Sequence, residues 1–435
     1  MEKPFLTILG GGVTGCALGY FASQKKIPFC IYEEKDQLGG HCATFEYNDF
    51  LFDSGAHRLH NKYPDVTDEI KKLLGDDLKQ IKTPSIIHYR NHNYKYPISL
   101  LDIFLKFDPF SLLYNLLTIL YRKISSENPF KNLDVCAKYL YGDFISNRFL
   151  LNYSEKLWGL PCTELSCEII ESRLNGLNIG NFLKKLSLTS DIDGIFYYPQ
   201  KGIGMITELL FEKFPYGTVH LNSKITKISH DFKKINSIQL NHSSMIPVEK
   251  VINTLPLNEF IFLFDPPPSK TVLSAAGNLQ FRDIILVGLL LNKESVTKAA
   301  TIYFPEKSVP FSRIYEPKNR STFMSPKNRT SLIAEIPCNA NESIDIEQLT
   351  QAAIKKLVNL GYMGADEVLD TFSCRLHNAY PILSITAKND KREIIKFLNL
   401  FNNLKILGRA GTFTYNWIHS NIRSAKDFID HVSYP

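Results

Sequence analysis

The sequence lacks charge runs, repeats and several well-known catalytic and phosphate-binding motifs. Its formal net charge is only +6, and the 50 Lys and Arg residues are spread along the chain without a basic run or stripe. That distribution argues against a nucleic-acid-binding protein. There is no internal repeat, no low-complexity tract, no phosphate-binding P-loop and no Ser-His-Asp set. With 435 residues, the chain exceeds what one hydrophobic core usually supports, so two or more domains are expected.

Metal and disulfide signals are also missing. None of the eight cysteines forms a CxxC pair, and no histidine cluster has the spacing of metal ligands, so we expect no metal site. Most of the cysteines lie in apolar surroundings, which predicts free thiols in a reducing compartment. The first residues show no basic region followed by an apolar signal core. Together these features predict a cytoplasmic protein.

A membrane-spanning helix needs about 20 largely uncharged residues, and the most apolar stretch of the chain does not meet this requirement, so no transmembrane segment is expected. The most apolar stretch, 98–121, is dense in Leu and Phe but is interrupted by Asp102, Lys106, Asp108 and Pro109. We expect two helices there that line a core or a channel. A peripheral contact with a membrane surface is the alternative.

The most informative stretch is the first 57 residues. The apolar run 5–9, a glycine turn, a helical segment over 16–23 and the apolar run 29–32 predict a βαβ unit. The turn matches G-x-G-x-x-G, in which glycines allow the backbone and a helix N-terminus to approach a pyrophosphate. The residues expected to hold the dinucleotide in this turn are Gly10, Gly12, Val13, Thr14 and Gly15.

A carboxylate follows at the spacing expected of a ribose partner. Glu33 ends the second strand, 23 residues after Gly10, where an acid hydrogen-bonds a ribose 2′-OH and disfavours a 2′-phosphate. Glu34 is the neighbouring alternative. The motif so far fits either NAD or FAD.

The residues after Glu33 distinguish these two cofactors. Gly39-Gly40 lies six residues beyond Glu33, and the phrase 31–41 resembles the second motif of the flavin amine-oxidase superfamily. In that family an apolar pair, Glu, five residues and Gly-Gly are usually followed by Arg, whereas this chain has His41. The resemblance implies that the cofactor is FAD, with Gly39, Gly40 and His41 near its phosphates.

Further segments resemble the same family. Phe52–His57 looks like the turn beneath the isoalloxazine ring, and His220–Ile228 is similar to the strand whose backbone pairs with the adenine edge. Leu407–Gly411 resembles the closing Gly-Arg turn that precedes a helix pointing at the flavin. His419 stands where the family usually has Asp. The cofactor contacts that the resemblance implies here are Gly55, Ala56, His57, Ile225, Gly408, Arg409, His419, Asn421 and Ile422.

Another set of segments resembles the protoporphyrinogen-oxidase-like and UDP-galactopyranose-mutase-like members. These segments are 94–97, 149–159, 198–205, 311–314 and 379–381. In mutases an Arg and a Tyr of this kind hold a diphosphate, so the resemblance implies that Arg313 and Tyr380 contact substrate, and Arg173 stands similarly. A salt bridge at a strand edge is the alternative for Arg313. His57 is the candidate catalytic histidine, and Lys201 is a further polar candidate near the ring.

The expected fold is α/β, with a Rossmann-type FAD-binding domain interleaved with a mixed-sheet substrate domain and a helical insertion. We expect FAD-binding segments at 1–78, 195–265 and 401–435, a mainly helical substrate or lid region at 79–194, and a substrate domain with an antiparallel sheet at 266–400.

The resemblance implies an FAD-dependent oxidoreductase that transfers a hydride from a C–N or C–C bond of a small molecule to flavin N5. Two alternatives stay open. One is a mutase-like enzyme without net redox change that acts on a nucleotide sugar. The other is a non-catalytic FAD-binding protein. An anionic or nucleotide-linked substrate suits the mild positive charge, and the electron acceptor and oligomeric state are left open.

Overall fold

The computed structural model describes residues 4–98, 102, 105–125, 128–173, 194–243 and 245–434, without the side chains of 171–173. Its first layer is a five-stranded parallel sheet in the order β20-β13-β1-β2-β9. β1 and β2 are buried throughout, as expected of a parallel sheet that is covered on both faces. The strands are β1 (Leu6–Leu9), β2 (Phe29–Tyr32), β9 (Gly217–His220), β13 (Lys250–Asn253) and β20 (Leu404–Ile406).

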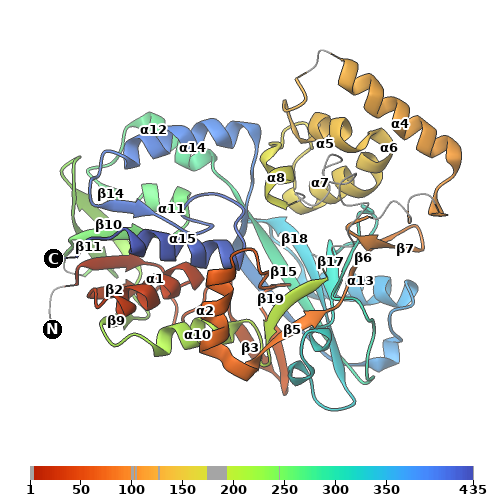
Figure 1. Cartoon of the computed structure of the whole chain (residues 1–435), viewed down its shortest axis with the longest axis horizontal. Helices are drawn as coiled ribbons and strands as arrows, with labels where there is room; N and C mark the ends of the chain where they lie inside the picture. The colour runs from red at the N-terminus through yellow and green to blue at the C-terminus, as the bar shows by residue number, and fades with distance from the viewer. Residues whose placement is uncertain are drawn as a thin grey trace.

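Helices and a small second sheet flank this parallel sheet (Figure 1). The helix after the glycine turn packs between two helices from distant parts of the chain, α10 and α15. These helices are α1 (Val13–Gln24), α10 (Gly204–Glu212) and α15 (Ile418–Asp430), with α2 (Pro64–Leu74) beside them. The small sheet comprises β10 (Ile225–His230), β11 (Ile235–Leu240), β12 (Met245–Pro247) and β14 (Phe264–Asp265), and its neighbouring helices are α11 (Leu257–Ile261), α12 (Lys270–Asn278) and α14 (Ile385–Leu398).

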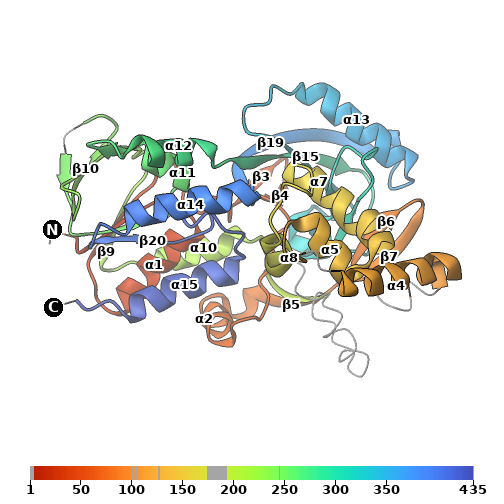
Figure 2. The same cartoon turned by 90° about the horizontal axis from the view of Figure 1, so that it is seen from above.

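A seven-stranded mixed sheet forms the other half of the molecule, in the order β19-β15-β18-β17-β16-β6-β7. Only β16 and β6 pair in parallel, and all eleven residues of the central strand β15 are buried. α13 (Ile346–Asn359) lies beside β19 (Figure 2). The strands are β6 (Ser85–Tyr89), β7 (His92–Tyr96), β15 (Phe281–Leu291), β16 (Thr301–Tyr303), β17 (Arg313–Tyr315), β18 (Thr330–Asn339) and β19 (Val368–Pro381).

A helical region sits on the mixed sheet, at the end of the molecule away from both termini (Figure 1). It contains α4 (Pro109–Ile124), α5 (Leu133–Tyr141), α6 (Asp143–Ile145), a π-helical turn (Ser146–Leu151), α7 (Asn152–Trp158) and α8 (Glu168–Arg173). Two short pairs complete the fold: β3 (Thr44–Tyr47) with β4 (Phe50–Asp53), and β5 (Leu78–Lys82) with β8 (Ile195–Pro199). Single helical turns lie at Gly75–Asp77, Pro317–Asn319, Thr322–Met324 and Ala365–Glu367.

The expected fold class is confirmed: a parallel βαβ sheet, a mixed sheet and a helical insertion are all present. Two local expectations were wrong. The strand expected within His220–Ile228 is the end of one strand and the start of another in a different sheet, because Asn222 turns the chain with φ +52° between them. Within the apolar stretch 98–121, the helix α4 does not line a core, since most of its apolar side chains are exposed; residues 99–101, 103 and 104 lie outside the described residues. Among the described helices, none is long and apolar enough to cross a membrane.

Candidate functional site

Distant segments of the chain meet at the carboxyl edge of the parallel sheet. Gly10 follows β1, Thr254 follows β13, and Gly408 follows β20. A Cβ on Gly10 would lie 2.5 Å from Thr254 Oγ1, and one on Gly408 would lie 3.0 Å from Thr14 Oγ1. In an open parallel sheet, this edge is where ligands bind. The fold therefore brings the predicted first and last cofactor turns together.

The glycine turn leaves a helix N-terminus accessible to a ligand. Gly12 is the N-cap of α1 and supplies no side-chain cap. A Cβ on Gly12 would meet only the Gly39 carbonyl oxygen, at 4.0 Å, whereas a Cβ on Gly15 would lie 2.1 Å from the Gly10 carbonyl oxygen. Gly39 also donates its N–H to the Gly11 carbonyl (2.9 Å). Gly15 is thus required for packing, while the space beside Gly12 fits a phosphate group.

Glu33 is fixed beside this turn. Its buried carboxylate accepts the N–H of Gly11 (2.7 Å) and that of Lys35 (3.0 Å), whereas Glu34 is exposed. The Ser223 N–H donates to the Glu33 carbonyl (2.8 Å), so the chain reaches Ile225 from the same edge of the sheet. Of the two candidate acids, Glu33 has the position and the rigidity expected of a ribose ligand.

The start of α15 presents buried polar atoms at the same edge. Both ring nitrogens of His419 and the Oδ1 of Asn421 are buried without a hydrogen-bond partner among the described residues. Trp417 is the N-cap residue of α15, and its side chain makes no capping hydrogen bond to the helix. Buried polar atoms are usually satisfied, so this pattern fits a polar ligand at the N-terminus of α15.

His419 is neutral at ordinary pH. Burial, with smaller contributions from the nearby His60 and Lys62, lowers its pKa to about 3. The unfolded chain binds a proton at His419 near pH 6.5, whereas the folded protein binds it only near pH 3. The contribution of neutral His419 to the free energy of unfolding is therefore fully present above pH 6.5 and is lost as the pH falls towards 3.

We therefore expect acidification from pH 7 to pH 5 to remove about 2 kcal/mol of unfolding free energy through His419. Denaturant unfolding of flavin-free protein measures this loss. The variant His419→Asn should have a smaller pH slope by that amount, while the exposed-site control His92→Asn should keep the native slope. Equal slopes for all three proteins would contradict the assignment.

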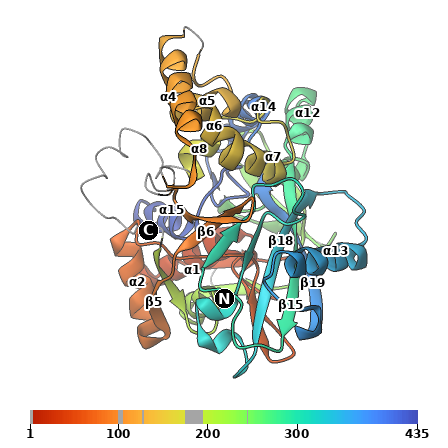
Figure 3. The ribbon, with the colours of Figure 1, turned by 90° about the vertical axis from the view of Figure 1, so that its right-hand side faces the viewer.

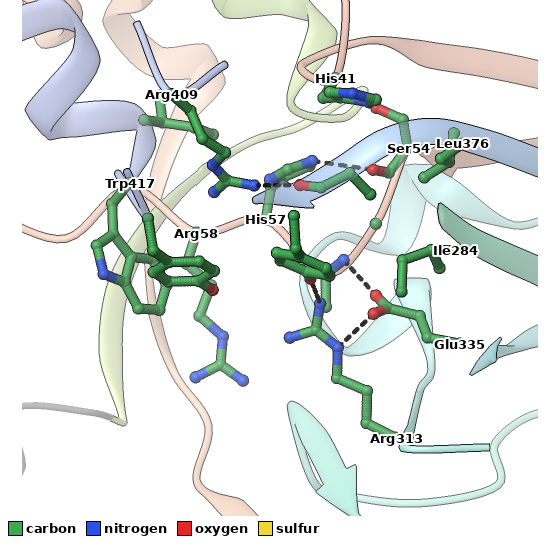
Figure 4. A pocket seen from close by; sticks show the side chains of 16 residues that line it. His41, Ser54, His57, Arg58, Ile284, Arg313, Glu335, Leu376, Arg409 and Trp417 are labelled. Carbon is green, nitrogen blue, oxygen red and sulfur yellow. Dashed lines mark hydrogen bonds and ion pairs between the residues drawn. The ribbon is translucent and has the colours of Figure 1, made fainter. Parts of the chain in front are cut away.

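A cavity of about 560 Å³, its mouth included, opens between the cofactor edge and the mixed sheet (Figure 4). It joins side chains predicted for the cofactor with side chains predicted for the substrate. From the first group it is lined by His41, Gly55, Ala56, His57 and Arg409, and from the second by Arg313 and Tyr380.

A chain of hydrogen bonds runs across this cavity (Figure 4). The Ala56 N–H donates to Glu335 Oε1 (2.9 Å), and Arg313 Nε donates to Glu335 Oε2 (2.6 Å). Arg313 Nη2 then donates to the hydroxyl of Tyr380 (3.1 Å). Burial lowers the pKa of Arg313, but the Glu335 carboxylate, together with the nearby Tyr380, Tyr153 and Tyr303, raises it above its usual value. Arg313 is therefore a permanent cation held in one orientation.

The histidines of the cavity are uncharged. Burial and the nearby Arg409 lower the pKa of His57 to about 3 and that of His41 to about 4. The Nε2 of His57 lies 3.0 Å from the Ser54 carbonyl oxygen, which can only accept, so Nε2 carries the proton and Nδ1 is an acceptor.

Arg409 forms part of the opposite wall. Its guanidinium donates to the carbonyls of Asn416 (2.6 and 2.9 Å) and Ala379 (3.2 Å) and lies 4.9 Å from the centre of the Tyr415 ring. With Arg58 and Arg313 also in the lining and Glu335 as the one lining carboxylate of the described cavity, the walls carry a net positive charge.

The turn before α10 holds Asp53, the residue that precedes the cavity-lining turn Ser54–His57. Asp53 is buried and accepts hydrogen bonds from Thr44 Oγ1 (2.7 Å), the Ile203 N–H (2.9 Å) and the Tyr198 hydroxyl. Burial raises the pKa of Asp53, and these donors oppose the rise. The segment 198–205 thus anchors the residue that precedes Ser54. Lys201, in the same turn, is exposed and lies outside the cavity lining.

Other candidates lie elsewhere, and some lining residues were missed. The side chain of Arg173 lies outside the described residues. Glu335 and Arg58 were not predicted. Glu335 had a detectable signal, because it is the one charged residue in the otherwise apolar run 332–336, and a buried acid needs a partner. Arg58 directly follows His57 and donates to Ser85 Oγ (2.8 Å) and Thr301 Oγ1 (2.7 Å).

Comparison with known proteins agrees with this architecture. The family model described as flavin containing amine oxidoreductase matches residues 22–381. A solved structure of reduced UDP-galactopyranose mutase is 19% identical and has a TM-score of 0.85, with 99% of this chain and 95% of that chain covered. A protein from Exiguobacterium sp. 255-15, whose description names protoporphyrinogen oxidase, is 17% identical (TM-score 0.77, coverage 99% and 98%). A putrescine oxidase variant is 12% identical (TM-score 0.68, coverage 98% and 97%). At these identities the solved structures establish the fold.

Proposed function

Because this chain belongs to the family of flavin-containing amine oxidoreductases, whose members bind FAD, we propose that it is an FAD-dependent oxidoreductase acting on a small anionic molecule. The bond oxidised would be a C–N or a C–C bond. The observation that carries the proposal is the single cavity that joins the cofactor turn Ser54–His57 to Arg313 and Tyr380. Its positive walls favour an anionic substrate.

The residues at the sheet edge fit FAD. Gly10, Gly12 and Gly15 with the first turn of α1 would hold the pyrophosphate, and Glu33 would bind the adenosine ribose. Gly39, Gly40 and the Gly408–Arg409 turn would close over the phosphates. The unpartnered polar atoms of His419 and Asn421 would serve the flavin end of the cofactor. FAD supplies the hydride acceptor when it is bound.

The chain's own groups would orient the substrate and control protons. Arg313, held by Glu335, presents a fixed positive charge to a carboxylate or phosphate. The Tyr380 hydroxyl can donate a hydrogen bond to the substrate because it already accepts one from Arg313. The neutral His57 offers Nδ1 as a proton acceptor. The aromatic walls formed by Tyr415 and Trp417 reduce access of water to these groups.

A mutase-like reaction without net redox change is the second candidate. The meeting of Arg313 with Tyr380 favours it, since the resemblance of these two segments to mutases implied a diphosphate site. The fold similarity to UDP-galactopyranose mutase is compatible with it.

Anaerobic titration of the yellow holoprotein separates these candidates. Bleaching of the flavin by candidate carboxylate- or phosphate-bearing amines, or by compounds with a saturated C–C bond, with release of the oxidised product, supports the oxidoreductase. Isomerisation of a nucleotide sugar that occurs only after dithionite reduction, without net oxidation, supports the mutase. A protein that holds FAD but shows neither response would be a non-catalytic flavin-binding protein. We also propose a cytoplasmic location, which suits cysteines that form no disulfide in the part of the chain that the structure describes.

Glu33→Ala should weaken FAD binding by about 1.5–3 kcal/mol, because a charge-assisted hydrogen bond to the ribose is lost. The dissociation constant, measured by quenching of flavin fluorescence, should rise accordingly. The matched control is Glu34→Ala, which removes an exposed acid at the adjacent position and should leave the affinity unchanged. The reverse order of effects would assign the ribose to Glu34.

A further inference from the structure

The helix α4 is attached to the protein through its polar side. Asn115, its one fully buried residue, donates from Nδ2 to the Tyr141 carbonyl (2.9 Å) and accepts from the N–H groups of Phe144 (3.1 Å) and Ile145 (3.2 Å). Two turns later, Arg122 forms an ion pair with Asp143 (2.7 Å). A surface helix normally turns its apolar stripe inward, so α4 has the opposite orientation.

The outward side of α4 is apolar along its whole length. Phe110 is 83% exposed, Tyr121 71% and Ile124 86%. The remaining exposed apolar residues of the helix, each about half exposed, are Leu113, Tyr114, Leu116, Leu117 and Leu120. All three ribbon views place α4 on the outside of the helical region, and Figure 3 shows it furthest from the two sheets. We call these eight side chains the α4 face.

The centre of the α4 face has the spacing of a helix-pairing seam. Phe110, Leu113, Leu117, Leu120 and Ile124 follow one another at intervals of three, four, three and four residues. This is the a/d spacing by which two helices pack side by side. From the exposed fractions, the α4 face presents on the order of 1,000 Å², which exceeds the largest apolar patch of most monomers and matches one side of a standard protein interface.

We propose that the α4 face binds the α4 face of a second copy of this chain, with the two helices antiparallel about a two-fold axis near Leu117. Charge complementarity supports the antiparallel direction. The exposed Asp108 lies at the N-terminal end of α4 and the exposed Lys123 near its C-terminal end, so each acid would meet the lysine of the other copy. In this arrangement the positive end of each helix dipole also lies beside the negative end of the other, which is favourable.

A lipid surface fits the α4 face less well. Helices that lie on membranes carry Lys and Arg on a solvent-facing polar side and at its edges. The polar side of α4 instead faces α5 and α6, and the cation Arg122 is already paired with Asp143. Lys123 is the one exposed cation within Pro109–Ile124.

Sedimentation equilibrium of the full-length protein, without lipid, tests the proposal. The wild type should be a dimer at micromolar concentration. Leu117→Asp, which places a carboxylate in the seam twice per dimer, should raise the dimer dissociation constant on the order of 100-fold. The control is Leu400→Asp, at a leucine that is 54% exposed against 55% for Leu117 but lies outside α4, and it should stay dimeric. Unchanged thermal unfolding of both variants shows that they fold.

Cysteine cross-linking tests the direction of the pair. When the single variants Phe110→Cys and Ile124→Cys are mixed and oxidised, the antiparallel arrangement gives a disulfide between the two different variants. Cross-linking of each variant with itself instead would overturn the antiparallel assignment. A wild type that is monomeric and floats with phosphatidylglycerol vesicles would overturn the self-association and assign the α4 face to lipid, and a Leu117→Asp variant that stays as dimeric as the wild type would also overturn it.

Discussion

Gly12→Val should yield a folded, colourless protein. The valine side chain would project from the N-cap of α1 into the space where a phosphate approaches, so FAD would be excluded. The protein itself tolerates a Cβ at this position, since the nearest atom is the Gly39 carbonyl oxygen at 4.0 Å. Flavin absorbance per polypeptide measures the loss, and circular dichroism confirms the fold.

Gly15→Val is the matched comparison in the same turn. Its Cβ would lie 2.1 Å from the Gly10 carbonyl oxygen, so this variant should fail to fold instead of failing only to bind FAD. The two glycines of one motif should thus separate ligand binding from packing. If the Gly12→Val protein carries one FAD per chain, the cofactor is not bound at this turn and the proposed function loses its basis.

The sequence signals that succeeded are local ones. The β1–α1–β2 unit follows from two apolar runs around a glycine turn, and α2 begins at Pro64 and ends before Gly75 as the proline and glycine predict. Such signals act within a few residues and do not depend on the rest of the chain. Glu33 follows from the spacing within this unit, whereas Gly408 could be placed near it only through the family resemblance, because the parallel register that aligns β20, β13 and β1 is not encoded in any one segment.

The sequence failed to predict which distant side chains form pairs and which side of a helix faces the protein. Glu335 lies 279 residues from Ala56 in the chain, and only the pairing of β18 with β17 brings it to Arg313. The apolar composition of α4 was correctly recognised, but the expectation that it lines a core was wrong. Composition does not specify which side of a helix faces the protein, and here Asn115 and Arg122 have specific partners inside while the leucines of the α4 face are exposed.

The largest stability effect is expected at the pair of Arg313 and Glu335. Glu335→Leu would leave a buried guanidinium without its counter-charge and should lower the free energy of unfolding by about 3–5 kcal/mol. The turn Ser54–His57 would also lose the acceptor of the Ala56 N–H. Denaturant unfolding of the flavin-free protein measures the change, and the same variant should lose substrate binding.

Removing both charges should cost much less than removing one. Arg313→Leu combined with Glu335→Leu replaces the pair by apolar groups of similar size, which is commonly close to neutral for a buried pair, so most of the loss should be recovered. The exposed pair Lys396 and Glu393 is the control, and Glu393→Leu should change stability by less than about 0.5 kcal/mol. If the double variant were as unstable as Glu335→Leu, the carboxylate would act mainly through Ala56 and the cofactor turn, and not as the counter-charge of Arg313. In that case, loss of the Glu335 carboxylate would weaken flavin binding more than it weakens substrate binding.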